Sequence, residues 1–241
     1  MIKVFVTDVS ALTPEAAERL YASLPRWRQD RLGHIHITKQ KMLSAGAGFL
    51  LAPAFDSFGL DAHTVRVSVN EHGKPYLTDV PGVHFSLSHS GSMAMCAIAD
   101  SPVGCDIQEL SAARRGERVA RRFFTPTEYA RITAAADPER EFVRLWTLKE
   151  SYVKYLGTGI GGCPLDSFEL VGEPPVLARP ESTPIPLFRE YTFGENLAGQ
   201  LTGQPEGHPE EQSEGQQPTG HLAAVCCAQM PGEASYVGIK M

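Results

Sequence analysis

The residues with the clearest chemical potential lie in one stretch, from Phe142 to Leu156. On a helix with about 100° per residue, its apolar side chains form one broad arc. Lys149 lies inside that arc, and a buried ammonium is costly without an anion, which indicates an anionic partner, either structural or bound. Glu150 and Lys154 stand together at the edge of the arc. The alternative there is an ordinary helix pair, worth about 0.2 to 0.5 kcal/mol.

A second candidate group lies in the strand-like segment 103–110. Asp106 interrupts small and apolar residues, and a buried carboxylate requires a metal, a cation or several donors; the alternative is an aspartate that caps the following turn. Strand alternation places Gln108 on the same face as Asp106 and Glu109 on the opposite face. If folding joins Asp106 and Glu150, they provide two hard oxygen ligands that suit Mg²⁺ beside a phosphate-containing substrate.

The third candidate group is the segment 86–91, where Ser86, Ser88, His89 and Ser90 gather at the end of a predicted strand. A Ser–His hydrolase is one alternative, but the G-x-S-x-G elbow is missing and no orienting acid is apparent. Serine and histidine in such a place also commonly form the turn itself. Hydroxyl and imidazole donors at a strand end suit phosphate binding better than covalent catalysis.

The elements that must position these residues predict an α+β fold. The first half is expected to contain a strand at 2–9, a helix at 13–24, a basic helix at 25–55 broken at its glycines, and strands at 65–69, 83–88, 93–99 and 103–107. The second half is expected to contain helices at 117–122, 127–136 and 140–156, and strands near 168–171, 187–193, 222–228 and 236–240. Two similar α+β halves, 1–105 and 106–241, follow from this order. Residues 199–220 are rich in Gly, Gln, Glu and Pro, and we expect a flexible insertion there.

Composition narrows the class of protein. The 241 residues carry a formal charge of −6 and are 42% hydrophobic, which excludes a collagen-like, a wholly disordered or a multi-span membrane chain. The five cysteines include no C-x-x-C pair, and no signal peptide or membrane-length apolar run is visible, so we expect a cytoplasmic protein with reduced thiols.

Charge is unevenly distributed along the chain. The net acidity argues against a general affinity for nucleic acid, and no membrane partner is expected. Two basic groups stand out, and each is either a solvated helix face or a docking surface for an anionic partner. They consist of Arg114, Arg115, Arg118, Arg121 and Arg122, and of Arg26, Arg28, Arg31, Lys39 and Lys41.

Taken together, these motifs resemble the 4′-phosphopantetheinyl transferase superfamily, in its long, pseudo-dimeric, surfactin-synthetase-activating type. The resemblance rests on the order and spacing of segments 85–91, 103–107, 123–128 and 146–154, with Gly73, Lys74 and Pro75 upstream, and it covers about residues 70–160. It implies two halves related by a pseudo-twofold, with the active site in the cleft between them, and an active monomer.

The resemblance also implies an activity. The 4′-phosphopantetheine arm of coenzyme A would be transferred to a serine of an apo acyl or peptidyl carrier protein, with release of adenosine 3′,5′-bisphosphate. Asp106, Glu150 and Lys154 would be catalytic, and Asp106, Glu150 and Gln108 would surround Mg²⁺, with the serine proton passing to Glu150 or to a metal-bound water. Coenzyme A would be bound by Lys74, Ser88, His89, Lys149, Lys154, Arg31 and Lys41.

One departure from the family pattern bears on the metal. Many members carry a second acid where this chain has Gln108, so we expect Mg²⁺ to bind mainly together with the coenzyme A diphosphate. Glu128 is similar to a family glutamate near the metal site, and the arginine-rich segment 114–122 would face the acidic helix of a carrier. Two other classes stay open: a non-catalytic coenzyme A or carrier-binding module, and another Mg²⁺-dependent enzyme that cleaves diphosphates.

Overall fold

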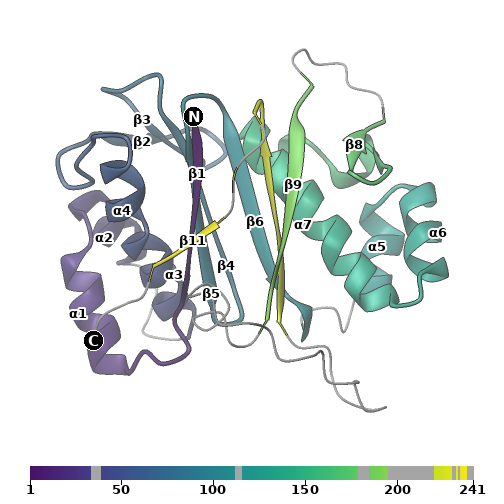
Figure 1. The fold of residues 1–241 in the computed structure, drawn as a ribbon, viewed down its shortest axis with the longest axis horizontal. Helices are drawn as coiled ribbons and strands as arrows, with labels where there is room; N and C mark the ends of the chain where they lie inside the picture. Colours follow the sequence, from purple (N-terminus) through teal and green to yellow (C-terminus); the bar gives the residue numbers. More distant parts are fainter. Residues whose placement is uncertain are drawn as a thin grey trace.

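The structure is a computed structural model that describes residues 1–33, 39–111, 116–178, 185–194, 220–229, 232 and 234–237. The helices are α1 (Pro14–Ser23), α2 (Arg26–Leu32), α3 (Lys39–Phe49), α4 (Leu51–Asp56), α5 (Gly116–Phe123), α6 (Pro126–Ala134), α7 (Pro138–Leu156) and α8 (Gly159–Gly162), with a 3-10 turn η2 (Leu165–Ser167). The strands are β1 (Ile2–Asp8), β2 (Val67–Val69), β3 (Pro75–Leu77), β4 (His84–Ser90), β5 (Met93–Ala99), β6 (Val103–Glu109), β7 (Leu170–Val171), β8 (Val176–Leu177), β9 (Leu187–Phe193), β10 (His221–Cys227) and β11 (Ala234–Tyr236). The fold is therefore α+β, as predicted (Figure 1).

The main strands form two sheets. The first has the order β11-β1-β5-β4 and the second the order β6-β10-β9, so that β4 and β6 are the neighbouring edges (Figure 1). Strand β1 pairs antiparallel with β5, with Val4 opposite Ala97, and parallel with β11. The C-terminal strand β11 thus belongs to the first sheet, and the expected boundary at 105/106 falls inside β6. The pseudo-twofold relation between the halves stays a prediction.

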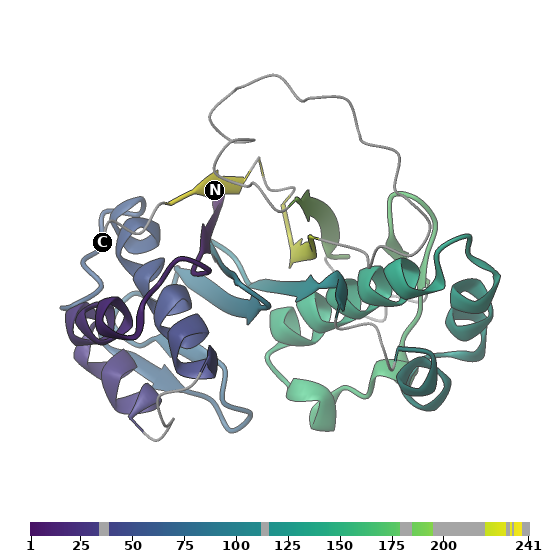
Figure 2. The ribbon, with the colours of Figure 1, turned by 90° about the horizontal axis from the view of Figure 1, so that it is seen from below.

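Strand alternation divides the hydrophobic core into layers. On β5, Ala94, Cys96 and Ile98 pack with α3 and α4 in one cluster, whereas Met93 and Met95 share another cluster with residues of β6, β9 and β10. The opposite face of β6 and β10 packs against α7. Figure 2 shows the strands between the two helix groups, with α1–α4 beside the first sheet and α5–α7 beside the second.

The long helix α7 is placed by a cap and by two glycines. Asp137 accepts a hydrogen bond from the Arg140 backbone N–H at 2.9 Å, and Gly157, with φ of 74°, ends the helix in the left-handed region. A Cβ at Gly104 would lie 2.1 Å from the Ser151 carbonyl oxygen and 2.2 Å from the Tyr155 nitrogen. Glycine on β6 therefore permits an approach of α7 that a side chain would prevent.

The basic helix expected at 25–55 is divided into α2, α3 and α4, and residues 34–38 between α2 and α3 lie outside the described ranges. Pro53 explains the break between α3 and α4, since its ring clashes with the carbonyl of the residue four positions earlier, Phe49, the last residue of α3. The expected insertion at 199–220 lies outside the described residues except for Gly220. None of the helices that the structure describes has the length and apolarity needed to cross a bilayer.

Candidate active site

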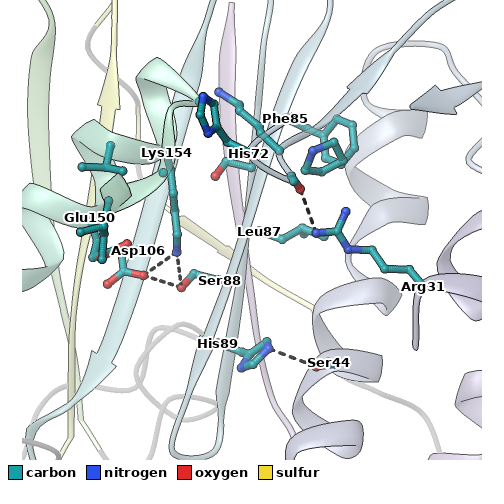
Figure 3. Close-up of a pocket in the computed structure, with 18 of the residues that line it drawn as sticks. Arg31, Ser44, His72, Phe85, Leu87, Ser88, His89, Asp106, Glu150 and Lys154 are labelled. Atoms are coloured by element: carbon teal, nitrogen blue, oxygen red, sulfur yellow. Dashed lines mark hydrogen bonds and ion pairs between the residues drawn. The ribbon is translucent and has the colours of Figure 1, made fainter. Parts of the chain in front are cut away.

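A cavity of about 700 Å³ lies where the two sheets meet, with lining residues from α2, α3, β4, β6 and α7 (Figure 3). Its walls combine groups from both helix clusters: Arg28 and Ser44 on one side, and Trp146, Glu150 and Lys154 on the other. The volume lies within the range of pockets that bind small molecules and cofactors.

A hydrogen-bonded triangle of Ser88, Asp106 and Lys154 occupies the centre of the pocket (Figure 3). The Ser88 hydroxyl donates to Asp106 Oδ1 at 2.7 Å, while Lys154 Nζ donates to the same oxygen at 2.6 Å and to Ser88 Oγ at 3.0 Å. Burial opposes the charged form of Lys154, but the charge and hydrogen bond of Asp106, together with Cys105 and Glu150, outweigh burial and raise the pKa of the amine. The ammonium is therefore held charged at the floor of the pocket.

Glu150 stands one helical turn before Lys154 and also lines the pocket. Burial, followed by the nearby negative charge of Asp106, raises the pKa of Glu150, and Lys154 partly offsets both effects. A divalent cation between the two carboxylates would relieve this repulsion, and carboxylate oxygens are the ligands that Mg²⁺ prefers. Within the described residues no three His, Cys, Asp or Glu side chains form a metal-binding group. A cation at Asp106 and Glu150 would therefore need oxygens from substrate or water.

Gln108 lies beside Asp106, and both the oxygen and the nitrogen of its side-chain amide form hydrogen bonds. Its Oε1 accepts a hydrogen bond from the Ser90 hydroxyl at 3.1 Å, and its Nε2 donates to Asp106 Oδ2 at 3.3 Å. In this arrangement Gln108 supports Asp106 through its nitrogen, and its oxygen is engaged by Ser90. Its placement in the Mg²⁺ ligand set stays a prediction.

Gln108→Glu is expected to tighten the binding of Mg²⁺ alone by about tenfold, because it adds a third carboxylate to a site with two. Calorimetric titration with MgCl₂ measures the affinity. Gln40→Glu, which adds the same charge on the α3 wall of the pocket, is the matched control and should change the affinity much less. An unchanged affinity in Gln108→Glu would exclude position 108 from the metal's surroundings.

The opposite wall of the pocket is positively charged. Arg28 is 7% exposed, donates through its NH2 group to the Ser44 carbonyl at 3.0 Å, and has an Nε without a hydrogen-bond partner among the described residues. Burial, and then the neighbouring Arg31, lowers the pKa of Arg28 to about 10. His89 Nε2 lies 3.1 Å from the Ser44 hydroxyl, and Arg31 donates to the Gly73 carbonyl at 2.9 Å (Figure 3). These groups form a basic side of the pocket, which we call the anion-binding wall because its charge suits an anion.

Sequence reasoning missed Arg28, Ser44 and Trp146 as lining residues of this pocket. In the sequence, Arg28 is only one member of a basic group. Its burial depends on how α2 packs against α3, and no local pattern in the sequence reports this packing. Trp146 lies within segment 146–154, one of the segments on which the family resemblance rests. It precedes Glu150 by four residues, and this spacing indicates that both side chains lie on the same face of a helix.

Two of the predicted coenzyme A ligands are not among the residues that line the pocket. Lys149, a residue of α7, is fully buried, and its Nζ binds Glu128 Oε1 at 2.8 Å and the carbonyls of Leu165 and Phe168 at 2.7 and 2.8 Å. Its anionic partner is therefore structural, and Glu128 serves that pair instead of the metal site. Lys41 lies over the Tyr21 ring, at 4.4 Å from its centroid, and 3.7 Å from Glu18, outside the pocket lining.

Lys74 lines the pocket, but its amine is engaged by the backbone. Its Nζ donates to the carbonyls of Val103 and Tyr155, both at 3.1 Å, and burial lowers its pKa to about 8. Lys74 thus links the loop before β3 to the start of β6 and the end of α7. In this position its amine holds the β2–β3 hairpin against β6 and α7.

Comparison with known proteins agrees with the geometry of the site. Residues 102–202 match the family model described as the 4′-phosphopantetheinyl transferase superfamily. The chain is 39% identical over 115 residues to 4′-phosphopantetheinyl transferase Sfp of Bacillus subtilis, an alignment that covers 47% of this chain and 50% of the relative. It is 32% identical over 151 residues to 4′-phosphopantetheinyl transferase HetI of Nostoc, with coverage of 60% and 63%. It is 28% identical over 165 residues to the human L-aminoadipate-semialdehyde dehydrogenase-phosphopantetheinyl transferase, with coverage of 61% and 53%.

An α+β fold with a pocket of two carboxylates, an ion-paired lysine and a basic wall agrees with the similarity of residues 102–202 to the 4′-phosphopantetheinyl transferase superfamily. The alignment to Sfp relates about half of the chain to transferases of the Sfp type. The matched region spans about half the length of the first of these curated relatives.

Proposed function

We propose that this protein transfers the 4′-phosphopantetheine arm of coenzyme A to a serine of an apo carrier protein and releases adenosine 3′,5′-bisphosphate. The observation that carries the proposal is the convergence of Asp106, Glu150 and Lys154 on one pocket whose opposite wall holds Arg28 and His89. Coenzyme A carries a diphosphate on the 5′ oxygen of its ribose and a further phosphate on the 3′ oxygen, and these two anionic groups match this distribution of charge. The names of the aligned transferases support the same reaction.

The reaction needs positioning and charge neutralisation more than covalent participation by the protein. The serine oxygen of the carrier forms a bond to the pantetheine-side phosphorus, and the bond from that phosphorus to the oxygen of the departing nucleotide breaks. The serine proton passes to the Glu150 carboxylate, whose raised pKa suits a proton acceptor. Lys154 neutralises charge on the phosphate oxygens.

Asp106 and Glu150 would hold Mg²⁺, and the ion, when bound, would neutralise the diphosphate. The Asp106 carboxylate already accepts hydrogen bonds from Ser88, Gln108 and Lys154, so its orientation is set before any cation arrives. The Arg28 guanidinium, whose Nε has no hydrogen-bond partner among the residues that the structure describes, would bind the 3′-phosphate of the nucleotide together with His89 and Arg31.

The carrier protein would approach the basic face of α5. Arg118, Arg121 and Arg122 are exposed there, and Phe123 is 41% exposed at the end of the helix. Arg114 and Arg115, which belong to the same run, lie outside the described residues. Complementary charge would mainly raise the association rate and select acidic carriers.

Coenzyme A binding at pH 7 is expected to take up protons, up to about one per site, because burial and the charge of Arg28 lower the pKa of His89 and a bound phosphate would raise it. His89 is thus neutral in the free protein, and affinity should fall as pH rises through neutrality. Calorimetry in buffers of different ionisation enthalpy measures the uptake. His89→Gln should lower it, whereas the exposed His63→Gln should not.

One assay tests the proposed function directly. The protein is incubated with coenzyme A, Mg²⁺ and an apo carrier, and the carrier is weighed by mass spectrometry. A phosphopantetheine increment that Asp106→Ala abolishes supports the transferase. Coenzyme A binding without an increment would indicate a binding module, and release of phosphate without a carrier would indicate a hydrolase.

A further inference from the structure

The seam between the two sheets lacks the backbone pairing that joins strands elsewhere in the described fold. The first sheet ends at β4 and the second at β6, and although these edges are in close contact they form no common ladder. Figure 1 shows the two strands as neighbours. The backbone N–H groups on this edge of β6 therefore need acceptors of another kind, since buried amides are rarely left unpaired.

Three serine side chains of β4 provide those acceptors. Cys105 N–H donates to Ser86 Oγ at 3.1 Å, Ile107 N–H donates to Ser88 Oγ at 3.4 Å, and Glu109 N–H donates to Ser90 Oγ at 3.0 Å. Each donor lies 19 residues after its acceptor, so the two strands run in parallel past one another with one hydroxyl bond at every second residue. We call this arrangement the serine ladder.

Alternation along β4 explains why serines can take this role. Phe85 packs into the core formed with α4, and His89 reaches Ser44 on α3, so the odd-numbered side chains face the first helix group. The even-numbered side chains consequently point toward β6. Their hydroxyls can therefore accept from the backbone amides of β6.

The ladder is continuous with the active site. Its middle residue, Ser88, also bonds Asp106 and Lys154, and its last residue, Ser90, donates to the Gln108 amide that in turn donates to Asp106. Ser86 and Ser90 themselves touch neither Asp106 nor Lys154 in any described hydrogen bond. Their hydroxyls bond β6, the strand that carries Asp106, to β4, the strand that carries His89.

We propose that Ser86 and Ser90 are positioning residues, whose hydroxyl bonds to the backbone of β6 set the distance between the carboxylates and the anion-binding wall. The expected effect on catalysis rests on the proposed function, because only a substrate such as coenzyme A must contact the carboxylates and the anion-binding wall at the same time. A wider seam would leave the phosphorus misaligned with the incoming serine, and small displacements of reacting groups lower the rate strongly.

The first test is amide hydrogen exchange, which needs no substrate. In Ser90→Ala the Glu109 amide should exchange roughly tenfold faster, and in Ser86→Ala the Cys105 amide should do so, because each loses its acceptor. The control is Ser151→Ala, which changes a fully buried serine whose hydroxyl, within the described part of the chain, donates to the Leu148 carbonyl in its own helix. This control should leave both amides unchanged. Unchanged exchange in the ladder variants, or equal changes in the control, would overturn the proposal.

The second test separates positioning from stability. Ser90→Ala should lower kcat for the transfer by about tenfold with little change in KM for coenzyme A, and Ser90→Thr, which keeps a hydroxyl, should recover most of kcat. If the β6 amides exchange faster but kcat stays at the wild-type value, the serine ladder only stabilises the structure, and its positioning role is refuted. If wild-type protein transfers no arm, the proposed function fails, while the exchange rates still decide whether the hydroxyls hold the seam.

Discussion

Glu150→Gln is expected to lower kcat for phosphopantetheine transfer by about 1000-fold or more. The amide cannot accept the serine proton, a contribution of general base catalysis worth about 100- to 10,000-fold, and it also removes one of the two negative charges available to Mg²⁺. The fold should be preserved, because the Glu150 side chain makes no hydrogen bond or ion pair with another described residue, and burial already disfavours its charged form. Carrier mass and single-turnover kinetics measure the loss.

The matched control for this prediction lies on the same helix. Glu139→Gln makes the same change at an exposed position in the first turn of α7 and should leave kcat within a factor of two of wild type. Activity of Glu150→Gln within tenfold of wild type, with unchanged Mg²⁺ dependence, would exclude Glu150 from both roles proposed for it.

Lys149→Met is expected to lower the free energy of unfolding by about 3 to 5 kcal/mol, the usual result of removing one partner from a buried ion pair. The substitution leaves Glu128, only 1% exposed, without its cation, and leaves the carbonyls of Leu165 and Phe168 without a donor. Burial lowers the pKa of Lys149, and the neighbouring Glu128 carboxylate partly offsets this effect. Urea unfolding followed by circular dichroism measures the change.

Removing both charges together should cost much less than removing one. The double variant Glu128→Gln, Lys149→Met should recover a large part of the lost stability, whereas Arg26→Met, which breaks an exposed pair with Asp30, should change stability by less than about 1 kcal/mol. If Lys149→Met unfolds like wild type but no longer binds coenzyme A, the structural role of this lysine is wrong and the phosphate role expected from the sequence is right.

Local patterns in the sequence were sufficient for most of the elements. The sequence predicts a strand near 187–193, and β9 has these bounds. Thr13 and Pro14 predict the start of α1, where Thr13 Oγ1 accepts from the Ala16 amide at 3.2 Å. These features depend on residues that are close in sequence, so the sequence alone is sufficient to predict them. The same holds for the isolated anomalies, a lysine in an apolar arc and an aspartate in a buried strand.

Only the tertiary structure could show which groups pair with these two buried charged residues. The sequence by itself determined that Lys149 and Asp106 need partners, but folding assigns Glu128 to the former and Lys154 with Ser88 to the latter. It likewise directs Arg28 into the pocket and Lys41 away from it, although both lie in one basic region. The physical reason is that burial and pairing are properties of surfaces brought together from distant segments, and the direction of a charged side chain follows from that packing.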